Sequence, residues 1–392
     1  MNASLKYGRA VYVLGAGFSK PAGLPLGSEL LSAIKILLSK LPSVYSTVFL
    51  NSIDEFVHYL HHAHGKEIDR DSVDIEEFLS FFEVNEDLAL FGMATEALSD
   101  DTYVEKSFLK AIRYLTARTL YFAQNEATEF DLHLYREFAQ RLEPGDIVIT
   151  FNYDTLLEAA LEECGRQFRY SLYTDRSTWY IESVLPSTEI VLLKMHGSID
   201  WFERTNFENS EGRDGCAQTA ESHLERLAQW HPVFCANRFR PIPVVDQARF
   251  PGDPLCNVYR IRRLGEYFDD TGPIPHDVPL LVSPSNHKLH HFGVLREMWR
   301  GVGWANVACS KLVFIGYSLP TYDEYARYLF YNFVRVLRSS RLFNHNIRVV
   351  DYRTSPNDIA QLMRSICFID WDNTECYFDG FNMEAIKMIF DD

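Results

Sequence analysis

The sequence has few of the features that mark secreted, membrane-spanning or nucleic-acid-binding proteins. Its seven cysteines are scattered and form no C-x-x-C pair, which predicts reduced thiols in a cytoplasmic protein and argues against a four-cysteine zinc site. The apolar run at residues 10–14 is too short for a signal peptide or a membrane span. Lys and Arg number 38 against 54 Asp and Glu, and the net charge of −16 disfavours a broad nucleic-acid or membrane surface.

The composition is that of an ordinary globular protein. Hydrophobic residues make up 47% of the 392 residues and charged residues 23%, which excludes a disordered or collagen-like chain. This length predicts about two to three domains, or one large core with insertions.

Five short apolar runs predict buried strands. Each run is followed by glycine or polar residues, and the runs occupy residues 11–14, 147–151, 191–194, 312–315 and 347–350. Continuous apolar runs of this length are typical of parallel sheets that are buried on both faces. Ligands bind such sheets outside the carboxyl ends of the strands. The sequence therefore predicts an α/β protein whose site residues follow the strands.

Two long stretches separate these strands. Residues 41–142 contain helical patterns, of which Ile75, Phe78, Leu79 and Phe82 have the i, i+3, i+4, i+7 spacing of one buried helix face. We interpret this stretch as a helical insertion. Residues 203–303 are richer in Pro, Arg and His and show weaker periodicity, so they form a second insertion of undefined architecture.

The first candidate site is the segment Gly15-Ala16-Gly17-Phe18-Ser19. Closely spaced glycines after a strand let the backbone approach a pyrophosphate, and a following helix start supplies N–H groups. Lys20 occupies the third glycine position of G-x-G-x-x-G, and no acidic strand end follows about 20 positions later, so a conventional dehydrogenase is disfavoured. A plain strand–helix turn is the alternative.

The second and third candidates follow the next two strands. Asn152 and Asp154 can orient a ribose, an amide or a water, although Asp154 can equally cap the helix that follows. His196 can transfer protons near neutral pH, and Gly197 behind it leaves room for a substrate. A lone histidine is more often structural, and this alternative stays open.

The fourth candidate is Gly316-Tyr317-Ser318, with Asp323 close after it. Such a turn can hold a phosphate or a ribose hydroxyl through Ser318 and backbone N–H groups. It lacks the G-x-S-x-G spacing of a nucleophilic serine, so Ser318 is not interpreted as a nucleophile. Its alternative role is that of a helix cap.

No metal site is predicted. Two histidine clusters have helical spacing, but neither has an identifiable carboxylate or cysteine partner. They comprise His58, His61, His62 and His64, and His287, His290 and His291.

The four candidate sites together resemble, in order and spacing, the sirtuin-like (silent-information-regulator) superfamily of NAD-consuming enzymes. The resemblance covers the strand-bearing segments, and both insertions lie outside it. It implies a Rossmann-like NAD-binding catalytic domain formed by residues 1–40, 143–202 and 304–392, with the insertions at 41–142 and 203–303. It also implies that NAD is the substrate and that the nicotinamide–ribose bond is cleaved.

The resemblance implies a role for each strand-end residue. Asn152 and Asp154 would orient the nicotinamide ribose, the carboxamide and an attacking water, and His196 would be the general base. The remaining residues would bind the phosphates and the adenosine half of NAD, and they are Gly15, Ala16, Gly17, Ser19, Gly316, Ser318 and Asp351.

Departures from the family pattern indicate a branch. Deacylases of the superfamily carry Phe-Arg after a Gly-Leu-Pro segment, and a zinc ribbon. Here Leu26 and Gly27 follow Pro25, and no cysteines have zinc-ligand spacing. The pattern is similar to prokaryotic sirtuin-like proteins of antiphage defence, which hydrolyse NAD to ADP-ribose and nicotinamide.

The branch also implies partners. Its stand-alone members resemble the subunit that assembles with a HerA-type hexameric DNA-translocase ATPase. We therefore expect a cytoplasmic, homo-oligomeric NAD hydrolase that acts without a metal. The alternatives are an NAD-dependent protein deacylase and a non-catalytic module that binds NAD or ADP-ribose.

Overall fold

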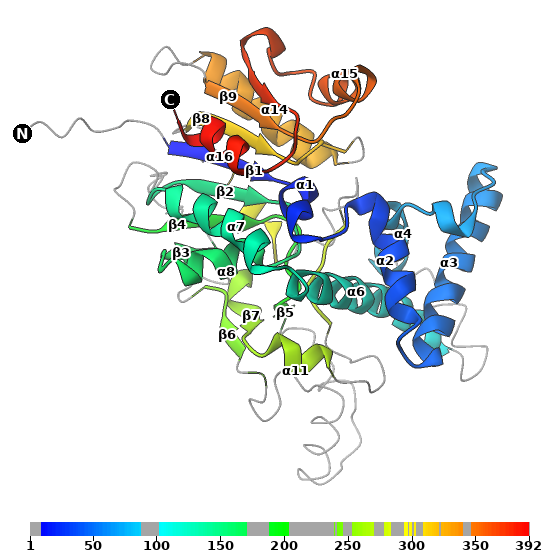
Figure 1. Ribbon diagram of the computed structural model, residues 1–392. Coiled ribbons are helices and arrows are strands. Elements are labelled where there is room, and N and C mark those ends of the chain that lie inside the picture. The colour runs from blue at the N-terminus through cyan, green and yellow to red at the C-terminus, as the bar shows by residue number, and fades with distance from the viewer. Residues whose placement is uncertain are drawn as a thin grey trace, which may run out of the picture.

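The centre of the molecule is a seven-stranded parallel sheet (Figure 1). The computed structural model describes residues 9–87, 102–170, 188–203, 239, 241–245, 253–269, 278–283, 294–296, 298, 299, 302, 309–320, 323–339 and 346–391. The strand order is β10-β9-β8-β1-β2-β4-β3. The strands are β1 (Arg9–Leu14), β2 (Ile147–Thr150), β3 (Phe168–Arg169), β4 (Ile190–Lys194), β8 (Cys309–Ile315), β9 (Asn346–Val350) and β10 (Glu375–Tyr377).

The predicted Rossmann-like parallel sheet is confirmed. The five apolar runs form β1, β2, β4, β8 and β9, and every one of these strands pairs in parallel with its neighbour. The two edge strands of the sheet, β3 and β10, were not predicted from the sequence. These strands are only two and three residues long and partly exposed, so they carry no long apolar run.

Helices cover both faces of the sheet. On one face lie α7 (Glu129–Arg141), α8 (Leu156–Glu163) and α16 (Met383–Phe390), and on the other lies α14 (Glu324–Ser339) (Figure 1). The helix α15 (Pro356–Ser365) joins β9 to β10. From β1 the chain builds one half of the sheet and then returns to β8 on the other side of β1. This reversal makes the carboxyl ends of β1 and β8 the expected ligand position.

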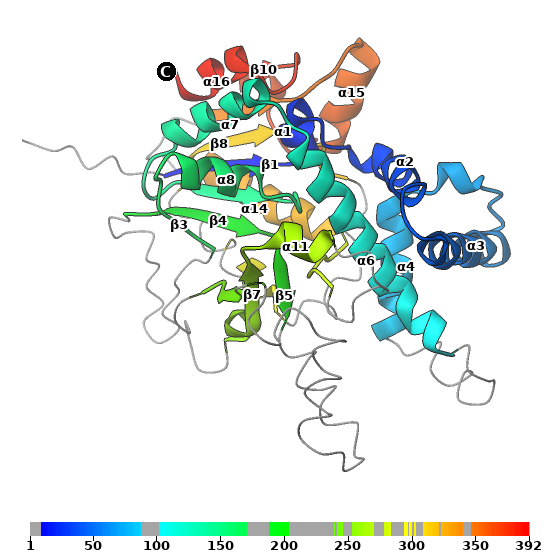
Figure 2. The same cartoon turned by 60° about the horizontal axis from the view of Figure 1, so that its bottom comes forward.

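The helices of the first insertion pack beside the edge at which the strands end (Figures 1 and 2). They are α3 (Ser43–His64), α4 (Ile75–Asp87) and α6 (Thr102–Asn125), and α2 (Gly27–Leu38) packs with them. We call these four helices the helical block. The predicted stripe of α4 is buried, and Phe49 and Phe56 of α3 lie edge-to-face against Phe78 at ring distances of 6.0 and 5.6 Å. The boundaries of the domains stay a prediction.

A small antiparallel sheet of order β5-β7-β6 joins the second insertion to the residues just before it. Its strands are β5 (Trp201–Glu203), β6 (Pro241–Pro243) and β7 (Val258–Ile261), and α11 (Leu264–Phe268) follows them. Their three to four residues are too few for a periodic pattern, and β6 contains two prolines, which are rare inside strands. This explains why the sequence indicated no architecture here.

Short helical turns complete the described structure. They are α1 (Ala16–Ser19) and the 3₁₀ segments Lys20–Ala22, Arg70–Ser72, Pro254–Asn257 and Trp371–Asn373. No single helix among the described residues is long and apolar enough to cross a membrane, whereas the bent pair Ala16–Ala22 and Gly27–Leu38 meets that test when its halves are combined.

Candidate functional site

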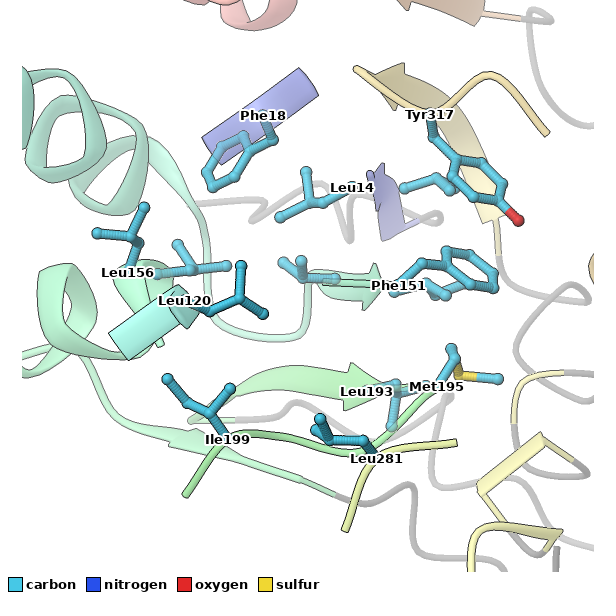
Figure 3. Packing of buried hydrophobic residues seen from close by; sticks show 14 of the residues in the cluster. Leu14, Phe18, Leu120, Phe151, Leu156, Leu193, Met195, Ile199, Leu281 and Tyr317 are labelled. Carbon is cyan, nitrogen blue, oxygen red and sulfur yellow. The ribbon is translucent and has the colours of Figure 1, made fainter. Parts of the chain in front are cut away.

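An aromatic stack brings three strand ends together. The ring of Phe151, directly after β2, lies parallel to the ring of Tyr317, after β8, with 4.2 Å between centroids. The ring of His196, after β4, meets Phe151 edge-on at 5.0 Å. Figure 3 shows Phe151 with Tyr317 above it and Met195 below it. The second, third and fourth candidate segments therefore share one edge of the sheet.

The first and second candidate segments are joined by hydrogen bonds. The Asn152 side chain donates through Nδ2 to the Gly15 carbonyl at 2.9 Å and to Ser19 Oγ at 3.0 Å. Ser19 Oγ donates to Asp154 Oδ2 at 2.7 Å. Among the described residues these bonds use only the amino group of Asn152, so its amide oxygen is available to a ligand.

Asp154 also contacts the start of the helix that follows, although the N-cap residue of α8 is Thr155 rather than Asp154. Its Oδ1 accepts the backbone N–H of Leu156, the first residue of α8, at 3.2 Å. One carboxylate oxygen thus stabilises the helix start while the other binds Ser19. Both Asp154 and Ser19 are buried, so they hold the loops together around Asn152.

Three candidate glycines pack against one another. A Cβ on Gly15 would lie 2.5 Å from the Gly316 carbonyl oxygen, and one on Gly17 would lie 2.7 Å from Gly316 Cα. Gly316 itself has a φ of 59°. The loops after β1 and β8 therefore approach backbone to backbone, which only glycine allows. Their contact with a pyrophosphate stays a prediction.

His196 is buried, with 4% of its surface exposed, and it faces an acid. Its Nε2 lies 3.3 Å from Oδ2 of Asp323, which is fully buried. Asp323 Oδ1 accepts the N–H of Ala326 at 3.1 Å and so caps α14. The alternative cap role of Ser318 is wrong, because Ser318 lies before the turn that leads to Asp323 and its side chain is exposed.

Two tyrosines beside His196 stay protonated. Burial raises the pKa of Tyr317 well above its usual value, and the nearby Asp323 carboxylate raises it further. Burial also raises the pKa of Tyr153, again with help from neighbouring carboxylates. The hydroxyl of Tyr153 donates to the Val282 carbonyl at 2.8 Å. Both phenols are therefore neutral hydrogen-bond donors at physiological pH.

A segment from the second insertion covers the loop after β4. We call residues 278–283 the strap. The Val282 N–H donates to the His196 carbonyl at 2.9 Å, and the Ser198 N–H donates to the Leu280 carbonyl at 3.1 Å. Gly197 has a φ of 83°, and a Cβ there would lie 2.0 Å from the Leu280 oxygen. Gly197 thus makes room for the strap, and not for a substrate as its place beside His196 had suggested.

Sequence reasoning missed a buried ion pair at the end of β4. Lys194 Nζ lies 2.8 Å from Glu158 Oε1 of α8, and it also donates to the Asp154 carbonyl. Burial raises the pKa of Glu158, and the positive charge of Lys194 opposes that shift. The only signal in the sequence was a lysine that closes an otherwise apolar strand.

The other predicted binding residues lie around this centre. Asp351, at the end of β9, is half-buried, and its Oδ2 accepts from Arg353 Nη2 at 2.9 Å. Ala16 is half-buried at the start of α1, and Ser318 is exposed. Within the described residues, no side-chain hydrogen bond joins Ser318 or Asp351 to Asn152, Ser19 or Asp154.

The described residues offer no metal centre. No group of three or more His, Cys, Asp or Glu side chains among them could hold a metal ion. His58 and His62 lie on α3 with 4.1 Å between ring centroids. The cluster of His287, His290 and His291 lies outside the described residues.

Comparison with a family model finds a similarity over one segment of this site. A family model described as a SIR2-like domain matches residues 146–229, which include Asn152, Asp154 and His196. This stretch of the chain is therefore similar to a SIR2-like domain. Members of the SIR2 family are NAD-dependent enzymes, either deacylases or NAD hydrolases, and they use NAD as a substrate. A search of the curated proteins finds no match.

Solved structures of Sir2 are also similar. One is Sir2 in complex with the inhibitor EX-527, 2′-O-acetyl-ADP-ribose and deacetylated p53 peptide. It is 13% identical, with 97% of this chain and 92% of that chain covered and a TM-score of 0.32. Another is Sir2 with a p53 peptide and NAD+, which is 14% identical, with 97% and 91% covered and a TM-score of 0.33.

Proposed function

We propose that this protein is an NAD hydrolase, which cleaves the nicotinamide–ribose bond with water and releases ADP-ribose, nicotinamide and a proton. The observation that carries the proposal is the placement of Asn152 and His196. Both belong to the SIR2-like segment, and both follow strands, β2 and β4, whose carboxyl ends share one edge of the sheet with those of β1 and β8. An amide oxygen and an imidazole at this edge are suited to hold and deprotonate a water.

The proposed reaction assigns a task to each of these groups. Departure of nicotinamide leaves positive charge on the ribose, which the amide oxygen of Asn152 would stabilise. His196 would accept a proton from the attacking water, directly or through a ribose hydroxyl. Asp323, 3.3 Å from His196 Nε2, would stabilise the imidazolium that forms. The loops at Gly15, Ala16, Gly17 and Ser19, and at Gly316 and Ser318, would bind the phosphates and riboses, with Asp351 toward the adenosine.

The test is NAD consumption by the purified protein, with the products resolved by chromatography. Asn152→Ala and His196→Ala should each lower turnover by about 10²–10⁴-fold, because each removes a group from the reacting centre. His133→Ala and Asn357→Ala change exposed residues of the same types and should leave turnover unchanged. Melting temperatures control for folding.

Two other results would contradict the proposal. Tight NAD binding without turnover would identify a regulatory module that binds NAD or ADP-ribose. Nicotinamide release that requires an acyl-lysine peptide would identify a deacylase.

We extend the proposal to the biological setting on the strength of the motif resemblance. The protein would act in the bacterial cytoplasm as a homo-oligomer that depletes NAD during phage infection, with a HerA-type ATPase as its partner. Mass photometry of the purified chain tests the oligomer, and co-purification with a co-expressed HerA-type ATPase tests the partner. Loss of phage resistance in cells that carry His196→Ala tests the role in defence.

A further inference from the structure

A buried carboxylate joins the helical block to the strap. Glu83, on α4, has 1% of its side chain exposed. Its Oε1 lies 3.1 Å from Arg113 Nη2 of α6 and accepts the Ser283 N–H at 3.1 Å. Its Oε2 accepts the Ser283 hydroxyl. The Glu83 side chain therefore accepts both hydrogen-bond donors of Ser283 in the strap, and it also pairs with Arg113 of the helical block.

The strap in turn contacts the proposed site through Val282, the neighbour of Ser283. The Val282 N–H donates to the His196 carbonyl at 2.9 Å, and the Val282 carbonyl accepts from the Tyr153 hydroxyl at 2.8 Å. A continuous series of hydrogen bonds and one peptide unit thus connects Glu83 to the backbone of His196. This short series of bonds runs from α4 to the loop that follows β4.

The surroundings of Glu83 are those of an apolar core. Phe78, Leu79 and Phe82 on the same helix are buried, and an apolar residue at position 83 would avoid the cost of burying a charge. A carboxylate can accept an N–H and a hydroxyl of one residue at once, which no apolar side chain can do. The carboxylate of Glu83 is therefore suited to hold the strap in place through Ser283.

We propose that Glu83 is a positioning residue. It holds the strap at Ser283 and, through Val282, sets the placement of His196 and Tyr153, so that the helical block controls the geometry of the catalytic edge. This inference rests on the proposed function. It predicts that displacement of α4 changes the rate of the chemical step more than it changes NAD binding, because Glu83 does not touch the reacting atoms.

The experiment compares Glu83→Gln, Ser283→Ala and the double variant with wild type. Each single variant should lower kcat about 10–100-fold, with KM within about threefold, because small misplacement of a catalytic group is costly. The double variant should be no slower than the slower single variant, since both changes break the same contact. Glu77→Gln alters an exposed carboxylate on the same helix and should keep wild-type kinetics.

Hydrogen exchange of the strap provides a readout apart from activity. Amides of residues 278–283 should exchange faster in Glu83→Gln and Ser283→Ala than in Glu77→Gln, while the sheet keeps its protection. Unchanged kcat, additive losses in the double variant, or an exchange increase spread over the whole chain would each overturn the inference. If wild type does not consume NAD, the proposed function fails, and strap exchange alone decides whether Glu83 holds the strap.

Discussion

Two polar clusters connect the insertions to the sheet and to one another, and they are built differently. In the first, cations alternate with carboxylates. Lys194 pairs with Glu158 at 2.8 Å, and Arg260 of β7 pairs with Asp200 at 2.7 Å and Glu162 at 2.8 Å. In the second, Glu83 divides its bonds between Arg113 and the uncharged strap.

This difference indicates that the two clusters have separate tasks. When one partner of a buried ion pair is removed, the free energy of unfolding falls strongly, because the other charge stays buried and uncompensated. A carboxylate that binds backbone and hydroxyl groups sets the position of a segment. We therefore expect the Lys194 cluster to govern stability, and the Glu83 cluster to govern the geometry around His196.

The largest effect is expected from Lys194→Met. It leaves Glu158 buried without its cation and should lower the free energy of unfolding by about 3–5 kcal/mol, measured by urea denaturation. Lys387→Met removes one partner of an exposed pair with Glu384 and should cost about 0–1 kcal/mol. If Lys194→Met and Lys387→Met lose equal free energy of unfolding, the Lys194 cluster does not govern stability.

Gly197→Ala should have an intermediate effect that isolates the strap. The substitution forces a side chain into the left-handed region and displaces the Leu280 carbonyl, so it should cost about 2–4 kcal/mol. Gly23→Ala is the matched control, because Gly23 also has a φ of 83° but no atom within 4 Å of the new Cβ. It should cost about 1–2 kcal/mol. If the two variants have equal unfolding midpoints, the strap is not closely packed at Gly197.

The smallest effect concerns Asp146, a buried carboxylate outside both clusters whose Oδ2 accepts the Glu143 N–H at 2.8 Å. Burial raises the pKa of Asp146 from 3.8 to about 6, so the folded state binds this proton more tightly than the unfolded state. The resulting stabilisation is complete below about pH 4 and is lost as the pH rises through about 6. The unfolding free energy of wild type relative to Asp146→Asn should fall by about 1–3 kcal/mol between pH 4 and pH 7. A pH-independent difference would show that Asp146 has an ordinary pKa.

The strands and the strap show what sequence patterns can predict. Strands buried on both faces need continuous apolar runs, so the five long strands were predictable, as was the regular stripe of α4. The strap is held to residues 196–201 by backbone hydrogen bonds, which leave no pattern in the side chains. Glu83 and Lys194 were missed for a related reason. Charged residues normally indicate exposed positions, and the partners that allow their burial lie 200 and 36 residues away in the chain.

The candidate site was predictable in place but not in its contacts. Asn152 and His196 follow strands whose ends share one edge, which the sequence indicated. The structure adds the partners, which are Ser19 for Asp154 and Asp323 for His196. Asp323 lies close after the fourth candidate segment, but it does not directly follow a strand, so the strand-end pattern could not pair it with His196. The catalytic roles of these residues stay predictions.

The central strand has a consequence for how the protein is made. β1 is translated before the other described strands of the sheet, yet it pairs with β2 on one edge and with β8 on the other. One edge of β1 therefore stays open until residues 309–315 have been translated, and the backbone contact between Gly17 and Gly316 forms only then. A nascent chain cannot assemble both sides of the ligand position. An enzyme with the proposed activity would thus spare the NAD of its own cell until residue 316 has been synthesised.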